Sequence, residues 1–94
     1  MASSYAGKRV SGAAATVHEG SGWLLALLVN HGQGTAQTVT LYDNTADAGP
    51  VLLTLTLPAN AQPVYLEFLH PIPFSTGLRV APASADVNVW AKGR

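Results

Sequence analysis

The sequence predicts an all-β fold: a single antiparallel β-sandwich of about seven to eight short strands, preceded by an extended N-terminal arm. Turn-forming residues recur about every 8–12 residues, many segments between them alternate apolar and polar residues, and no helical pattern is longer than about two turns. The 94 residues are enough for one domain. We therefore expect an arm at residues 1–14 and a sandwich domain at residues 15–94.

The segment Val39–Pro58 predicts a β-hairpin with a long loop. Two runs of alternating residues flank the turn-forming insert Asp43–Pro50, and each run has one apolar face and one threonine-rich face. Paired positions must have matching parity, because a one-residue slip would put leucine opposite threonine on both faces. We therefore expect two core-side pairs and two pairs on the other face: Leu41–Leu53 and Val39–Leu55, then Thr40–Thr54 and Thr38–Thr56.

Residues 1–14 are mostly small and polar, and we predict that they form an arm that becomes ordered on a partner. Tyr5 would anchor this arm. Lys8 and Arg9 would make charge contacts, and Val10 would add the second apolar side chain. The alternative is a frayed terminus that has no role in binding.

The run Trp23–Val29 is apolar at both parities. Leucine favours helix, but seven residues are few for a helix, and glycines flank the run. The run is also far shorter than the roughly twenty residues that a membrane-spanning helix needs. We predict a central strand that is covered on both faces. The first strand is expected just before it, at Ala15–Glu19 with Val17 inward.

The C-terminal half supplies the remaining strands. Residues 62–69 alternate again, and the last strand is expected at Asp86–Ala91. Between them, the prolines of His70–Pro73 lack an amide donor, so we expect an extended crossing between the sheets and no ladder there. A further strand is expected near Leu78–Val80.

Two aromatic side chains at outward parity predict contact sites. Tyr65 alternates with inward Val64 and Leu66, and Trp90 follows inward Val89. Exposed aromatics on a charge-poor surface are typical of sites that bind a partner. The alternative is that Trp90 folds over a sheet edge.

The inward parities also define the predicted core. Truncating one of its leucines, Leu55, to alanine should destabilise the protein by roughly 2–5 kcal/mol. The predicted core residues are Val17, Leu25, Leu27, Val39, Leu41, Leu53, Leu55, Val64, Leu66, Phe68, Leu78, Val80, Val87 and Val89.

The composition argues against several classes of function. Charged residues make up 11% of the chain, with five basic and five acidic, where a soluble domain usually has about 25%. So little charge favours a surface that neighbours cover, and it provides no cluster of Lys and Arg for nucleic acid. The chain has no cysteine, which excludes disulfides and thiolate metal sites and fits assembly in a reducing cytoplasm.

No residue pattern indicates an active site. The three histidines are far apart in the sequence and are expected in loops or on the surface: His18, His31 and His70. Asp43 and Asp47 could hold calcium with Asn44, but the loop lacks the further acidic ligands of a strong site, so local turn hydrogen bonds are the preferred interpretation. We expect no enzyme activity, no catalytic residue, no metal, no cofactor and no small-molecule substrate.

Four motifs carry a resemblance: Val-Thr-Leu-Tyr-Asp-Asn-Thr-Ala-Asp-Ala-Gly (39–49), Leu-Thr-Leu-Pro (55–58), Ile-Pro-Phe-Ser-Thr-Gly-Leu-Arg-Val (72–80) and Ala-Asp-Val-Asn-Val-Trp (85–90). Over roughly residues 15–91 the chain resembles small β-sandwich virion structural proteins of tailed bacteriophages. In that group Pro-Phe-Ser-Thr-Gly-Leu precedes a strand, as residues 73–78 do here. The motifs are structural, so the resemblance carries over no catalytic residues.

The resemblance implies a phage structural protein that is assembled in the host bacterial cytoplasm and located in the virion. We predict a capsid decoration (cement) protein that binds the major capsid protein and neighbouring copies of itself, and that stabilises the shell. A tail or collar (head–tail) accessory protein is the alternative within this class. The alternative from another class is a carbohydrate-binding host-attachment module that stacks Trp and Tyr on sugars. Neither nucleic acid nor a membrane is expected as a partner.

Overall fold

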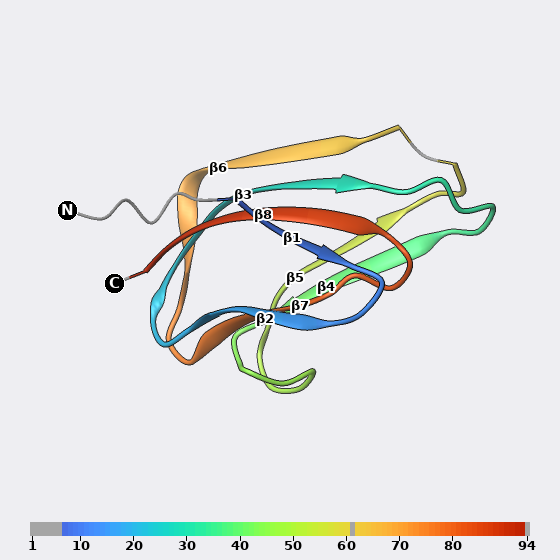
Figure 1. The fold of residues 1–94 in the computed structure, drawn as a ribbon. Coiled ribbons are helices and arrows are strands. Elements are labelled where there is room, and N and C mark those ends of the chain that lie inside the picture. Colours follow the sequence, from blue (N-terminus) through green and yellow to red (C-terminus); the bar gives the residue numbers. More distant parts are fainter. Residues whose placement is uncertain (1–6, 61, 94) are drawn as a thin grey trace.

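The computed structural model describes residues 7–60 and 62–93 as two stacked layers of β-sheet (Figure 1). The described residues form eight strands and no helix, and each sheet has four strands. The predicted antiparallel β-sandwich is confirmed. The strands are β1 (Gly7–Ser11), β2 (Ala15–Glu19), β3 (Gly22–Asn30), β4 (Gln37–Tyr42), β5 (Val51–Leu57), β6 (Val64–Phe74), β7 (Gly77–Ala81) and β8 (Asp86–Gly93).

The strand order divides the chain between the two layers. One layer, the β3 sheet, has the order β1-β8-β3-β6, and the other, the β4 sheet, has the order β2-β7-β4-β5. All neighbouring strands are antiparallel. Every connection changes layer except the β4–β5 hairpin. The edge strands are β1 and β6 in the β3 sheet, and β2 and β5 in the β4 sheet.

The hairpin register is confirmed at all four predicted pairs. Leu41 pairs with Leu53, Val39 with Leu55, Thr40 with Thr54 and Thr38 with Thr56. On the outer face the hydroxyl oxygens of Thr38 and Thr56 lie 3.0 Å apart and share a hydrogen bond. Face parity therefore set this register correctly.

The core fills the space between the central strands of the two sheets. Seven predicted core residues are fully buried: Leu27, Val39, Leu41, Leu78, Val80, Val87 and Val89. Six others pack against this core but are only partly buried: Val17, Leu53, Leu55, Val64, Leu66 and Phe68. Five of these six lie on β5 or β6, which are edge strands, so the core is less completely covered on that side.

Leu25 is the predicted core residue that the structure places on the outer face instead. The ladders from β3 to β6 and to β8 both skip Leu25, which makes it the extra residue of a β-bulge. Before the bulge Leu24 points inward, and after it Leu27 and Val29 do so, all with no exposed surface. Strict alternation could not place this extra residue, because the run is apolar at every position. The predicted central position of this strand is confirmed, because β3 lies between β8 and β6, while among the described residues a second sheet covers only its inner face.

The segment His70–Pro73 was expected as a crossing between sheets, but it lies inside β6. Ile72 pairs with Leu24 and Pro73 with Trp23, so the ladder includes a proline. An edge strand tolerates proline, because its missing N–H can lie on the unpaired side. Four residues, 68–71, lie opposite Leu25 without partners, and β6 bends sharply in this region (Figure 1).

The predicted boundary between arm and sandwich also changes. Gly7–Ser11 forms β1, which pairs with β8 along its whole length, so this part of the predicted arm belongs to the sandwich. Val10 is 3% exposed and forms part of the core. The sequence did not indicate a strand here, because Val10 is the only large apolar residue in Gly7–Ser11 and one residue cannot reveal an alternating pattern.

Candidate binding surface

The outer face of the β3 sheet carries three large aromatic side chains: Trp23, Tyr65 and Trp90. Each has its position because its neighbours in the strand point into the core. Leu24 fixes the direction of Trp23, Leu66 that of Tyr65, and Val89 that of Trp90. Within the described residues no second sheet covers this face, so Tyr65 is exposed and the two tryptophans are half-buried.

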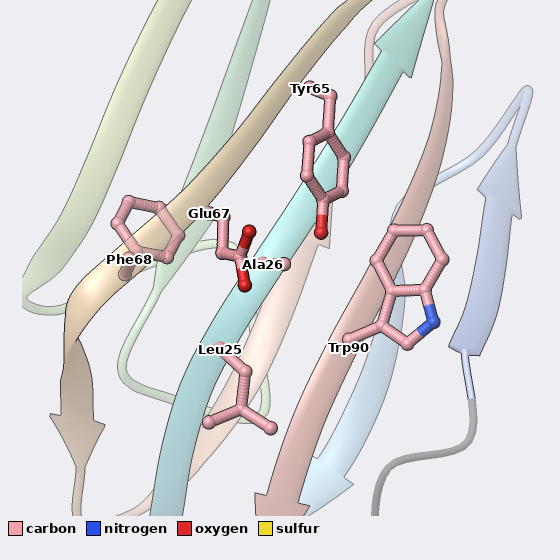
Figure 2. Close-up of a pocket in the computed structure, with 6 residues that line it drawn as sticks. All are labelled: Leu25, Ala26, Tyr65, Glu67, Phe68 and Trp90. Atoms are coloured by element: carbon pink, nitrogen blue, oxygen red, sulfur yellow. The ribbon is translucent and has the colours of Figure 1, made fainter.

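Tyr65 and Trp90 meet above the middle of the sheet. Tyr65 lies on β6 and Trp90 on β8, with β3 between them, and their rings contact edge to face with centroids 6.0 Å apart and planes at 77°. Ala26 on β3 lies between them and is 5% exposed, while Tyr65 keeps 55% of its surface exposed. Figure 2 shows the Tyr65 hydroxyl directed toward the space between Glu67 and Trp90. Two predicted contact residues are therefore brought together as one pair.

Two shallow hollows extend from this pair along the sheet. The first, of about 300 Å³, is lined by Leu25, Ala26, Tyr65, Glu67, Phe68 and Trp90 (Figure 2). The second, of about 420 Å³, is lined by Trp23, Leu25, His70, Pro71 and Lys92. Leu25 borders both, so the two hollows are adjacent at the bulge in β3. We call the two hollows with their rim the aromatic groove.

The groove carries little charge. Its ionisable side chains are Glu67, His70 and Lys92, so one acid, one base and one histidine are spread over two hollows. Glu67 is the only carboxylate among the described lining residues, which gives no acid–base pair of the kind that glycoside hydrolysis requires. Aromatic rings with a few polar groups suit binding by burial and stacking.

The other predicted contact residues do not join this groove. Lys8 and Arg9 are exposed on β1, and Arg9 forms an ion pair with Asp86 at 3.2 Å. Val10 is buried in the protein's own core. The prediction that its side chain contacts a partner was therefore wrong. Tyr5 lies outside the described residues.

The calcium hypothesis for Asp43 and Asp47 is not supported by the geometry, because both carboxylates already have protein partners. Asp43 accepts hydrogen bonds from the backbone N–H groups of Thr76 (2.8 Å) and Ser75 (3.1 Å), and Asp47 accepts one from Arg79 at 2.7 Å. Burial raises the pKa of Asp43, but these backbone hydrogen bonds together with those from Gly77 and the Ser75 hydroxyl outweigh it and lower the pKa overall. Asp43 thus fastens the β4–β5 loop to the β6–β7 turn.

His31 and His18 have structural contacts, and His18 lies half-buried in β2 and not in the expected loop or surface position, whereas His70 is exposed as predicted. His31 is only 6% exposed; its Nδ1 accepts from the N–H of Gln33, so its Nε2 donates to the carbonyl of Pro58 at 2.9 Å. His18 packs edge to face on Phe74. His31 lies in a loop as predicted, but it is buried. Among residues 7–60 and 62–93, no group of three or more acidic or histidine side chains could hold a metal ion.

Sequence reasoning missed the second half of the groove. Trp23 and Lys92 reach the same outer face because they are directly paired across β3 and β8. The signal for Lys92 was available, because it shares the parity of Trp90. Leu25 could not be found in this way, because its position depends on the bulge.

Comparison of the chain with protein-family models, with curated proteins and with solved structures found no match. In the part of the chain that the structure describes, no helix is long and apolar enough to span a membrane.

Proposed function

We propose that this protein is a bacteriophage virion structural protein of the capsid decoration (cement) type, and that it attaches to the major capsid protein through the aromatic groove. The observation that carries the proposal is the pair of exposed Tyr65 and half-buried Trp90, which lies on a sheet face that no other strand among residues 7–60 and 62–93 covers. The four sequence motifs and the low charge of the chain support the virion assignment.

The physics of the groove suits a permanent contact. Interface centres are enriched in Trp and Tyr and depleted in charge, and a few such residues supply most of the binding energy. The groove matches this composition, with three aromatic rings and Leu25 against one acid and one lysine. Because apolar contacts dominate, raising the salt to about 1 M should leave the protein bound, unlike a complex formed by charge attraction.

The direct test is binding to phage shells that lack the protein. The double variant Tyr65→Ala/Trp90→Ala should bind at least about 30-fold more weakly than the unmodified protein, because it removes the centre of the contact. Tyr42→Ala is the matched control, since Tyr42 is an aromatic residue at outward parity on the other sheet. Unfolding midpoints of both variants show whether they remain folded.

Equal occupancy of the shells by the groove variant and the unmodified protein would refute attachment through this face. A second measurement tests the cement role itself. Particles without the protein should assemble but release DNA at a lower temperature than decorated particles, because many copies act together. Identical release temperatures would end the cement proposal, and a count of only a few copies per virion would favour a tail or collar position.

A carbohydrate-binding attachment module is the second candidate. The observation that favours it is the placement of Glu67 beside Tyr65 and Trp90 (Figure 2), because sugars stack on aromatic rings and donate hydrogen bonds to carboxylates. Glycan-array binding that Trp90→Ala abolishes and Tyr42→Ala retains would establish this candidate. Failure to bind any glycan, together with groove-dependent shell binding, would exclude it.

A further inference from the structure

The four edge strands of the sandwich differ in how they are protected from pairing with other chains. Natural edges are blunted by charge, proline, bulges or short length. β1 is short and carries Lys8 and Arg9, β2 is short and bulged at Val17, and β6 contains prolines, Glu67 and a kink. β5 (Val51–Leu57) has seven residues without a charge, a glycine or an internal proline, and its bulge at Leu52 leaves Leu53–Leu57 regularly paired. From Leu53 to Leu57 it is therefore the unprotected edge.

Apolar surface is concentrated at the same side of the molecule. The large hydrophobic side chains that are exposed among the described residues all lie on β5 or β6: Val51 (54% exposed), Tyr65 (55%) and Leu69 (88%). Of the ten apolar residues that pack against the core without full burial, seven also lie on these two strands: Leu52, Leu53, Leu55, Val64, Leu66, Phe68 and Ile72. The core is thus incompletely covered beside the unprotected edge.

We propose that β5 pairs with β5 of a second copy of this chain, antiparallel, about a two-fold axis at Thr54. In this register Leu53 faces Leu55 of the other copy, and Thr54 faces its own equivalent. Leu53 and Leu55 both point inward in their own hairpin, so apolar side chains meet on the core side. The two β4 sheets then form one continuous sheet of eight strands.

A second copy fits this edge for two reasons. The strand has no charge, so two identical edges do not repel, and its central Leu53-Thr54-Leu55 pattern is preserved when its direction is reversed. The buried area is also adequate. A seven-residue strand of about 24 Å and a molecular thickness of 20 Å give roughly 500 Å² per copy, on the order of 1,000 Å² in total, at the lower limit for a specific interface. We therefore expect a dimer that dissociates on dilution.

The first test is sedimentation of the full-length chain from about 1 μM to about 1 mM. The unmodified protein should shift from monomer to dimer. Thr54→Lys should raise the dissociation constant at least about tenfold, because it sets two like charges opposite each other at the axis. Thr38→Lys adds the same charge to the same face on β4, away from the edge, and should leave dimerisation nearly unchanged.

Charge complementation separates pairing from damage to the fold. Thr54→Glu alone should also be monomeric, whereas an equimolar mixture of Thr54→Lys and Thr54→Glu should form heterodimers. An unfolded or distorted variant could not be rescued in this way. A mixture that stays monomeric while unmodified protein dimerises would contradict the two-fold axis at Thr54.

Crosslinking tests the register. The chain has no cysteine, so a single introduced one reports on one position. Thr54→Cys should form a disulfide-linked dimer on oxidation, because directly opposed Cα atoms lie within about 4.5–5.5 Å. Thr56→Cys should not, since its equivalent lies four residues further along, about 14 Å away.

Three results would overturn the proposal: unmodified protein that is monomeric over the whole concentration range, dimers that Thr54→Lys does not weaken, or equal crosslinking at positions 54 and 56. The proposal does not depend on the groove lying against a capsid. If the groove variant loses shell binding but dimerises like the unmodified protein, the groove and the β5 edge are separate binding surfaces.

Discussion

The two sides of the sandwich are closed to different degrees. On one side β2 contacts β1 and β8 across the layers, and Val10 of the edge strand is 3% exposed. On the other side β5 and β6 leave inward-pointing side chains such as Leu55 and Leu66 only partly buried. Stability and exposed apolar surface are thus separated in this fold, because the closed side and the centre bury apolar side chains while the open side leaves part of them exposed.

The largest loss in the free energy of unfolding should come from truncating Leu41, and Leu55→Ala is its comparison. Both leucines point inward from the same hairpin, but Leu41 has no exposed surface whereas Leu55 is partly exposed. Leu41→Ala should lower the free energy of unfolding by about 3–5 kcal/mol and Leu55→Ala by about 2 kcal/mol or less, because the cost grows with the cavity that is left. Urea unfolding at low protein concentration, where copies stay apart, measures both. Equal costs would mean that the β5 side is closed after all.

Val10→Ala tests whether the closed side depends on β1. Val10 packs in the core, so its truncation should cost about 1–3 kcal/mol. Lys8→Ala on the same strand is exposed and should change stability by no more than about 0.5 kcal/mol. If both variants unfold at the same urea concentration as the unmodified protein, β1 is not a working part of the sandwich.

Asp43 fastens one end of the sandwich, and its contribution should depend on pH. Its backbone hydrogen bonds hold the pKa below the ordinary value of 3.8 despite burial, so the stabilisation is complete above that value and is lost as the pH falls through the lower folded-state pKa. At pH 7, Asp43→Asn should cost about 1–2 kcal/mol.

The difference between Asp43→Asn and the unmodified protein should therefore shrink as the pH is lowered from about 5 to about 2. Asp86, whose pKa is lowered by hydrogen bonds from Ser11 and Arg9, is present in both proteins and cancels in the difference. Unfolding curves at each pH give the comparison. A difference that stays constant over this range would show that the charge of Asp43 is not what stabilises the loop contact.

The smallest effect should come from the ion pair between Arg79 and Asp47, which lies at the surface of the β4 sheet. The pair is short, at 2.7 Å, but the Asp47 side chain is 46% exposed. Arg79→Gln should lower stability by about 0.2–1 kcal/mol, and about 1 M salt should reduce that difference. A loss larger than that of Val10→Ala would place this pair among the main stabilising contacts.

The sequence was sufficient for features that depend on a two-residue period. The fold class, the hairpin register and the outward direction of Tyr65 and Trp90 follow from alternation alone. Alternation carries no information where a run is uniformly apolar, which is why the bulge at Leu25 escaped prediction. Alternation also cannot show whether a proline lies in an edge strand or in a central strand of a sheet. For this reason residues 70–73 were predicted outside a strand, whereas they lie in the edge strand β6.

The aromatic groove was half predictable for the same reason. The outward direction of Tyr65 and Trp90 was predictable, because their neighbours in the strand point into the core. Their contact across β3 was not, because it depends on the order of the strands in the sheet, which alternation does not determine. Val10 was mistaken for a contact residue because a five-residue edge strand among small polar residues resembles a flexible terminus.

The bulge at Leu25 makes the outer face of the β3 sheet sensitive to the deletion of one residue. On β8 the partners of Leu24 and Ala26 are consecutive residues, so a chain without Leu25 would alternate without interruption and keep the same buried side chains. Leu25 borders both hollows, so its deletion should change the shape of the groove while the side chains that β3 buries beside β8 stay the same.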